Sequence, residues 1–120
     1  MKEYKLAQGE AKFADLIWTN APIASMELVK LSEKEMGWKK PTTFTVLRKL
    51  CQKGLFKNEN SIVSAVMTKD EYLSEHSRYY IEDTFGGSLP KFLTSFMGRD
   101  RLSDNQAEEL KRLIDEYKED

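Results

Sequence analysis

Apolar residues recur at helical spacing near the start of the chain. Phe13, Leu16 and Ile17 lie on one face of a stretch that runs from about residue 8 to residue 19, and this pattern predicts a first helix. The tripeptide Asn20–Ala21–Pro22 follows and is expected to end the helix, because proline cannot donate to the helical hydrogen-bond ladder.

Two further helices are predicted before the middle of the chain. One begins at Ser25, a residue type that caps helices well, and ends at Met36–Gly37, where glycine favours a C-terminal stop. The next begins at Pro41, whose missing N–H costs nothing in a first turn, and ends at Gly54. The apolar positions of the earlier helix are Leu28, Val29 and Leu31.

The third predicted helix divides into an apolar and a polar side. Its apolar side carries Val46, Leu47, Leu50 and Cys51, with Thr43 near the edge, whereas Thr42, Thr45, Arg48, Lys49 and Gln52 fall opposite. Arginine and lysine can pair with guanine or phosphate, glutamine with adenine, and a threonine methyl with thymine. The pattern therefore favours a helix that enters the major groove of DNA. An ordinary amphipathic surface helix is the alternative.

Strand-like segments follow the third helix. Leu55–Lys57 and Ser61–Met67 are separated by the polar turn Asn58–Glu59–Asn60, which predicts a β-hairpin. Three helices and a hairpin form the order of a winged helix-turn-helix domain, in which the third helix reads DNA. The predicted fold is therefore mainly α with a small β-hairpin, and its winged-helix domain spans residues 1–68.

Residues 69–120 are predicted to form a helical dimerisation region. Capping boxes at Thr68/Glu71 and Ser103/Gln106 each begin a helix, and a short apolar helix with Pro90 in its first turn lies between them. Such thin helices cannot cover their own apolar sides. They either fold back on the winged helix or meet a second copy, and a dimer is favoured because two DNA-reading modules need a fixed spacing.

The near-neutral charge of the whole chain, -1, conceals a basic centre and an acidic tail. The window Trp38–Lys57 holds six cations and no acid, whereas residues 99–120 hold five cations and eight acids. A basic window in an otherwise acidic chain is typical of a nucleic-acid contact. A solvated helix face that happens to be basic is the alternative.

Composition excludes several classes of protein. No apolar run is long enough to span a membrane, and the N-terminus lacks the apolar core of a secretory signal, so a cytoplasmic protein is expected. One cysteine and one histidine rule out a disulfide framework and make metal sites improbable. Cys51 is expected to pack in the core and His76 to lie at a surface or interface. Neither a cofactor nor an enzyme activity is expected.

A series of short motifs extends over nearly the whole chain. They are Leu16–Ile17–Trp18, Met26–Glu27–Leu28–Val29, Trp38, Thr42, Thr45–Val46–Leu47, Leu50, Lys53–Gly54–Leu55, Asp70–Glu71–Tyr72, Phe85–Gly86–Gly87–Ser88–Leu89, Phe92, Phe96, Leu102–Ser103 and Glu108–Glu109–Leu110. This ordered series resembles the penicillinase-repressor family of bacterial transcriptional regulators, also called the BlaI/MecI/CopY family. The resemblance implies a homodimeric winged-helix repressor that binds a pseudo-palindromic operator, in front of resistance genes such as those for penicillinase.

Pattern and resemblance together give two sets of candidate residues. The expected DNA-binding residues are Lys39, Lys40, Thr42, Thr43, Phe44, Thr45, Arg48, Lys49, Gln52 and Lys53. The expected dimerisation residues are Tyr72, Tyr79, Tyr80, Phe85, Leu89, Phe92, Phe96, Leu110, Leu113, Ile114 and Tyr117. The alternative function is a winged-helix protein-interaction module that does not bind DNA.

Three departures from the family pattern affect these expectations. The hairpin tip carries Glu59 and no cation, so it is expected to add little affinity for phosphates. No cysteine follows Cys51, which excludes the cysteine motifs of copper-responsive members. The resemblance implies a membrane sensor-linked protease system that cleaves at Ser95–Phe96, where the family pattern has Asn–Phe.

Overall fold

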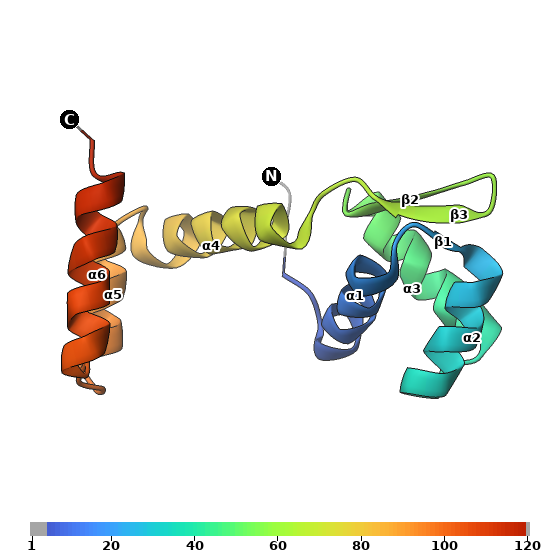
Figure 1. The fold of residues 1–120 in the computed structure, drawn as a ribbon, viewed down its shortest axis with the longest axis horizontal. Helices are drawn as coiled ribbons and strands as arrows, with labels where there is room; N and C mark the ends of the chain where they lie inside the picture. Colours follow the sequence, from blue (N-terminus) through green and yellow to red (C-terminus); the bar gives the residue numbers. More distant parts are fainter. Residues whose placement is uncertain (1–4, 120) are drawn as a thin grey trace. The chain divides into compact units, whose positions relative to one another are not determined.

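Six helices and three short strands make up residues 5–119, the part of the chain that the computed structural model describes (Figure 1). In chain order they are α1 (Gln8–Asn20), β1 (Ile23–Ala24), α2 (Ser25–Met36), α3 (Lys40–Gln52), β2 (Phe56–Glu59), β3 (Ile62–Ala65), α4 (Lys69–Phe85), α5 (Leu89–Met97) and α6 (Asp104–Tyr117). The predicted fold class, a winged helix followed by C-terminal helices, is confirmed.

The chain divides into two units, Met1–Tyr80 and Ile81–Asp120. The first unit contains α1 to α3, the three strands and the first turns of α4. The second contains the end of α4 together with α5 and α6. The sequence placed its division at residue 68, where α4 is about to begin, whereas most of α4 belongs to the first unit.

The first unit is built around one apolar core. Helices α1 to α3 lie on one side of the sheet (Figure 1), and each contributes fully buried side chains. The largest of these are Phe13 and Ile17 from α1, Leu28 from α2, Leu50 from α3, and Leu55, Phe56 and Val63 from the hairpin segment. Burying one such side chain stabilises a fold by about 1.5–3 kcal/mol, so this unit has the means to hold its shape.

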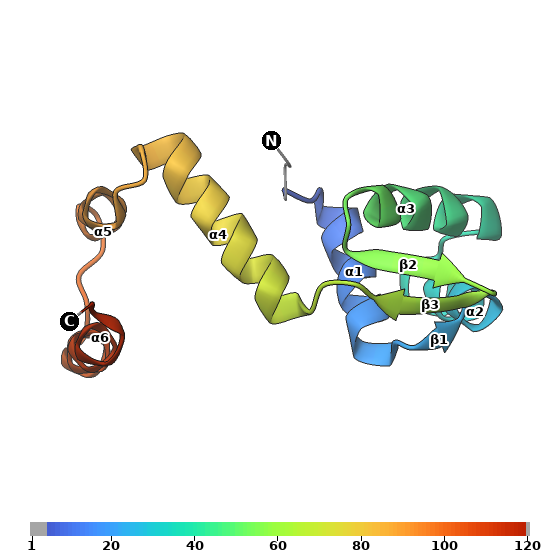
Figure 2. The ribbon, with the colours of Figure 1, turned by 90° about the horizontal axis from the view of Figure 1, so that it is seen from above.

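The sheet contains the predicted hairpin and one strand that the sequence did not predict. Strand β3 lies between β1 and β2, and both pairings are antiparallel (Figure 2). Within the hairpin Glu59 pairs with Ile62, and Ile62 also pairs with Ala24 of β1. The second hairpin strand is shorter than the predicted Ser61–Met67. Strand β1 has two residues, too few to show an alternating pattern.

Helix ends follow the predicted signals with small shifts. Both capping boxes form, since the Glu71 and Gln106 backbone N–H groups donate to the Thr68 and Ser103 hydroxyls. Gly37 ends α2 at φ 70, a left-handed conformation that glycine adopts without strain. Ser25 is the first residue of α2 rather than its cap, and Ala24 occupies the cap position. The third helix is displaced slightly, because it starts one residue before Pro41 and ends before Gly54.

The hairpin turn places two non-glycine residues in the left-handed region. Asn60 has φ 52 and Ser61 has φ 62. Two consecutive positive φ values define a turn in which asparagine followed by glycine is strongly preferred. The Ser61 carbonyl also accepts a hydrogen bond of 2.8 Å from the Ser25 backbone N–H, which ties the turn to the start of α2.

Replacing Ser61 with glycine is expected to stabilise the first unit. The substitution relieves the left-handed strain at Ser61 without removing the carbonyl that binds Ser25, and glycine accepts this conformation freely. We expect the free energy of unfolding to rise by about 0.5–1 kcal/mol, measured by urea denaturation. Ser64→Gly, inside β3, is the control and is expected to lower it. A loss of stability in Ser61→Gly would contradict this reading of the turn.

Candidate nucleic-acid interface

The outer side of α3 carries polar and basic side chains over its whole length. Thr42, Thr45, Arg48, Lys49 and Gln52 are all exposed. On the inner side Leu47 and Leu50 are 2% and 0% exposed, so packing against the core fixes which way the helix faces. The Thr45 hydroxyl donates to the Pro41 carbonyl at 2.9 Å and keeps its lone pairs as acceptors. The predicted division of this helix into two sides is confirmed.

The six cations of the basic window differ in whether their charge is already engaged. Three form ion pairs within the first unit: Lys39 with Glu33 at 3.2 Å, Lys53 with Glu10 at 3.6 Å and Lys57 with Glu59 at 3.7 Å. Within residues 5–119, Lys40, Arg48 and Lys49 form none. These three cations, all on α3, are the free cations of the window, in the sense that they form no ion pair in that range; the charge of Lys49 still helps to lower the pKa of Glu10.

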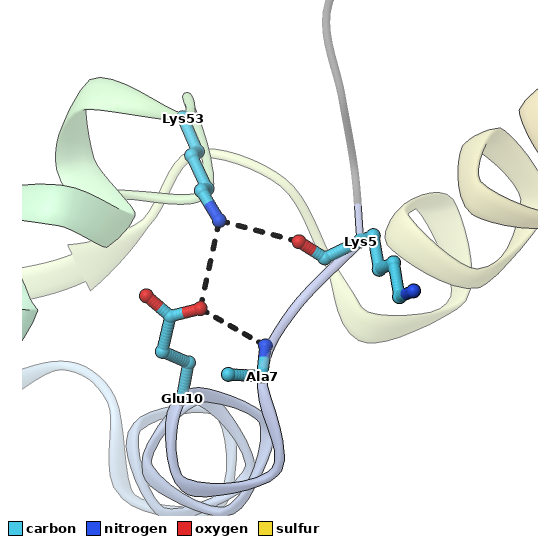
Figure 3. A network of polar contacts seen from close by, with 4 residues as sticks. All are labelled: Lys5, Ala7, Glu10 and Lys53. Atoms are coloured by element: carbon cyan, nitrogen blue, oxygen red, sulfur yellow. Dashed lines mark hydrogen bonds and ion pairs between the residues drawn. The ribbon is translucent and has the colours of Figure 1, made fainter.

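Lys53 has a structural role at the start of the chain (Figure 3). Its ammonium group pairs with the Glu10 carboxylate and donates to the Lys5 carbonyl at 3.2 Å. The same Glu10 oxygen accepts a hydrogen bond of 3.0 Å from the Ala7 backbone N–H. The network joins the segment before α1 to the end of α3. Lys53 was predicted to bind DNA, but the structure commits its charge to this network.

The network lowers the pKa of Glu10. The largest cause is the hydrogen bond from the Ala7 N–H, and the positive charges of Lys53 and Lys49 lower the pKa further. Partial burial of the carboxyl acts in the opposite direction but does not cancel these effects. An ionised Glu10 is therefore favoured by the folded state over the unfolded state.

Because the folded state lowers this pKa, the stabilisation from Glu10 is complete above its unfolded value of about 4.3 and is lost as the pH falls through the folded value. Glu10→Gln is expected to lower the free energy of unfolding by about 1–2 kcal/mol at pH 7. The difference from the wild type should shrink as the pH falls below the unfolded value and through the lowered folded value. Urea denaturation over a series of pH values from 7 downwards measures it. Glu59→Gln, in an exposed pair, is the control with little expected effect.

Two other predicted DNA-binding residues lie away from the exposed side of α3. Thr43 is 1% exposed, and its hydroxyl donates to the Ser32 hydroxyl at 3.0 Å. The prediction that Thr43 contacts DNA is therefore wrong, because the side chain links α3 to α2 inside the core. Phe44 is half-buried and lines a cavity of about 260 Å³ together with Leu47, Arg48, Cys51 and Asn58. This cavity is lined by residues of both α3 and β2, to which Asn58 belongs.

The second unit presents apolar side chains that nothing within it covers. None of the described residues 81–119 is buried. Leu89 is 55% exposed, Phe96 50%, Ile114 57% and Tyr117 81%. Leu102, Leu110 and Leu113 line a further cavity of about 240 Å³ with Gln106 and Glu109. Phe85 and Phe92 meet edge to face, with ring centroids 5.6 Å apart, and this contact joins the end of α4 to α5.

The predicted dimerisation residues are divided between the two units. Those in the second unit are half-buried or exposed, which is compatible with a surface that contacts a second copy. They are Phe85, Leu89, Phe92, Phe96, Leu110, Leu113, Ile114 and Tyr117. The sequence list omitted Leu93, Met97 and Leu102, which share this character. Tyr79 and Tyr80 end the first unit and are half-buried and exposed respectively. Tyr72 is 8% exposed within the core of the first unit, so its prediction as a dimer contact is wrong.

In the described part of the chain, the residues that carry reactive groups form no assembled site. Cys51 is half-buried, and burial raises the pKa of its thiol, which disfavours the reactive thiolate. His76 stacks on Tyr72 with ring centroids 5.6 Å apart. Among residues 5–119 no three His, Cys, Asp or Glu side chains gather as metal ligands would. No helix in this described range combines the length and the apolar character needed to cross a membrane.

Comparison with known proteins gives one consistent result. The penicillinase repressor family model matches residues 6–116. A penicillinase repressor from Bacillus licheniformis is 22% identical over an alignment of 118 residues that covers 95% of this chain and 92% of that protein. The methicillin resistance regulatory protein MecI of Staphylococcus aureus is 20% identical over an alignment of 117 residues that covers 94% of this chain and 95% of that protein. These relatives are repressors and regulators, not enzymes. The chain belongs to the penicillinase repressor family.

Proposed function

We propose that this protein is a homodimeric repressor that binds operator DNA through the exposed side of α3. The proposal rests mainly on how the side chains of that helix are divided between its two sides. Its inner side is locked into the core, and its outer side presents two threonines, a glutamine and cations without ion-pair partners in the described chain.

Each exposed side chain suits a particular part of the major groove. Arg48 and Lys49 can pair with a guanine edge or a phosphate, and Gln52 can pair with adenine. Thr42 and Thr45 can contact a thymine methyl or accept a hydrogen bond from a base. Lys39 and Lys40 stand at the start of α3, where backbone N–H groups also favour a phosphate. The helix therefore supplies both sequence reading and charge.

The second unit supplies the proposed dimer contact. Its side chains Leu89, Phe96, Ile114 and Tyr117 stay exposed within the unit, and a second copy offers the same surface in a symmetric pair. Two winged-helix units held in this way would occupy half-sites about 10 bp apart. Binding at a promoter would block transcription. Resistance genes of the penicillinase type are the proposed targets, since the relatives are named for them.

The experiment that tests DNA binding is a salt titration of the full chain on random-sequence duplex DNA. Three free cations per subunit give six per dimer, so the logarithm of the binding constant should fall against the logarithm of salt concentration with a slope of about -5 or steeper. No measurable binding at low salt would contradict the proposal. It would favour the alternative, a winged-helix protein-interaction module. Two features support this alternative: several cations already form ion pairs, and the hairpin tip carries Glu59.

Proteolytic control is the last part of the proposal. Ser95 and Phe96 are both exposed, Phe96 by 50%, but they lie within α5, so a protease must first unwind this helix. A sensor-linked protease is expected to yield a C-terminal fragment that begins at Phe96 when cells are exposed to a β-lactam. Mass spectrometry of the protein from induced cells measures this fragment. Derepression with an intact chain would contradict cleavage at this bond.

A further inference from the structure

Four aromatic rings form a continuous row through the first unit. Phe56 of β2 contacts Trp18 of α1, with ring centroids 5.2 Å apart. Trp18 contacts Tyr72 of α4 at 5.5 Å, and Tyr72 stacks on His76 at 5.6 Å with an angle of 14° between the rings. All four residues lie within Met1–Tyr80. The row connects the hairpin and α1 with the first turns of α4.

Polar contacts reinforce the same junction. The Trp18 indole N–H donates to the Met67 carbonyl at 2.9 Å, directly before α4 begins. Lys69 pairs with Asp15 of α1 at 2.9 Å, and the Thr68–Glu71 capping box closes the first turn. Both side chains of the Lys69–Asp15 pair are exposed, so this pair alone adds little to the stability of the junction. Tyr72, in contrast, is the residue of α4 that is buried.

From this junction we infer that Tyr72 is a positioning residue, which holds the start of α4 in one direction on the DNA-binding unit and so restricts the spacing between operator half-sites. The inference rests on the proposed function, since half-sites exist only if the protein binds DNA as a dimer. Tyr72 acts through α4 and does not contact DNA itself.

The length of α4 makes this direction important. A helix of 17 residues extends about 25 Å at a rise of 1.5 Å per residue. A change of about 10° in its direction moves its far end by roughly 4 Å, which exceeds the 3.4 Å spacing of successive base pairs. A loosely held start of α4 would therefore admit half-sites at more spacings than a start that is fixed on the first unit.

A distance measurement tests whether Tyr72 fixes α4. Spin labels are placed on Lys34→Cys in α2 and Ser77→Cys in α4, both exposed, in a Cys51→Ala background diluted with unlabelled chain. Pulsed electron–electron resonance should give one narrow distance distribution. Tyr72→Ala and Tyr72→Leu should broaden it at least twofold, while Leu73→Ala, an exposed neighbour, should not. Tyr72→Leu retains apolar bulk and covers the case in which Tyr72→Ala fails to fold. A narrow distribution in a folded Tyr72 variant overturns the inference.

A selection from random duplex DNA tests the consequence for spacing. The unlabelled wild type should enrich paired half-sites at one spacing, and Tyr72→Leu should enrich the same half-site sequence at several spacings. A single unchanged spacing in Tyr72→Leu overturns the spacing role. A wild type that enriches no DNA overturns the proposed function and the spacing role with it, while the distance measurement still decides whether Tyr72 fixes α4.

Discussion

Replacing Leu113 with aspartate is expected to dissociate the dimer and to abolish binding to the operator at concentrations where the wild type is fully bound. Leu113 is 38% exposed in the single chain and lines the apolar cavity on α6. A second copy that covers this surface would bury the new carboxylate without a partner, once in each subunit. The penalty is about 4 kcal/mol or more, which corresponds to a roughly thousandfold weaker dimer.

Sedimentation equilibrium of the purified protein measures this change directly. Asn105→Asp is the matched control, because it also adds one carboxylate to α6, at an exposed position that lies about 80° around the helix from Leu113 and about 180° from Ile114. The control should remain a dimer. The winged-helix unit should stay folded in both variants, since its core does not involve α6. A dimer that survives Leu113→Asp would show that this part of α6 is not buried between subunits.

Removing Arg48 or Lys49 from the outer side of α3 is expected to weaken operator binding, with no loss of stability for Arg48 and a small loss for Lys49, whose charge helps to lower the pKa of Glu10. Arg48→Ala and Lys49→Ala each remove a charge that forms no ion pair in the described part of the chain. If these side chains reach base edges, each substitution costs about 1–3 kcal/mol per subunit. If they reach phosphates, the salt dependence also becomes shallower by about two contacts per dimer.

Fluorescence anisotropy on operator DNA at several salt concentrations separates the two cases. Lys34→Ala, which removes an exposed charge from α2, is the control and should bind almost as well as the wild type. Lys53→Ala provides a second contrast, because its charge is engaged with Glu10. Lys53→Ala should lower the free energy of unfolding. Its effect on the free energy of DNA binding, measured at a low temperature where the variant is folded, should be smaller. Unchanged affinity and salt dependence in both Arg48→Ala and Lys49→Ala would contradict the assignment of α3 as the DNA-reading helix.

Much of the fold could be predicted because its signals are local. The Thr68–Glu71 and Ser103–Gln106 spacings predict capping boxes, and both form. Gly37 predicts the end of α2 because few other residues adopt a left-handed conformation there. The outer side of α3 follows from helical periodicity alone, since its apolar positions had to face a core.

The misplaced residues depend on contacts between distant parts of the chain. Thr43 stands at the edge of the apolar side of α3, and its burial against α2, where it donates to Ser32, depends on how the two helices pack. Tyr72 lies on an amphipathic helix, where periodicity cannot say which neighbour covers it. Its ring contacts Trp18 of α1, far away in the sequence, as well as His76 one turn further along α4. Lys53 was counted among the DNA-binding cations because its partner Glu10 precedes it by more than forty residues.

Which cations of the basic window are available to bind an anion could not be predicted from their number alone. Counting residues gave six cations in the basic window, but half of them form ion pairs with carboxylates on α1, α2 or β2. The remaining three lie on α3, where the helix faces outward. The structure therefore reduces a broad basic window to a narrow candidate surface and makes the salt dependence a sharper test.

Sequencing of genomic fragments captured by the purified full-length protein at moderate salt tests the central claim most directly. The account predicts enrichment of a few promoter fragments that share a pseudo-palindromic site with one half-site spacing, and loss of this enrichment with Leu113→Asp. A folded dimer that enriches no fragment above random genomic DNA would contradict the claim that this protein is an operator-binding repressor.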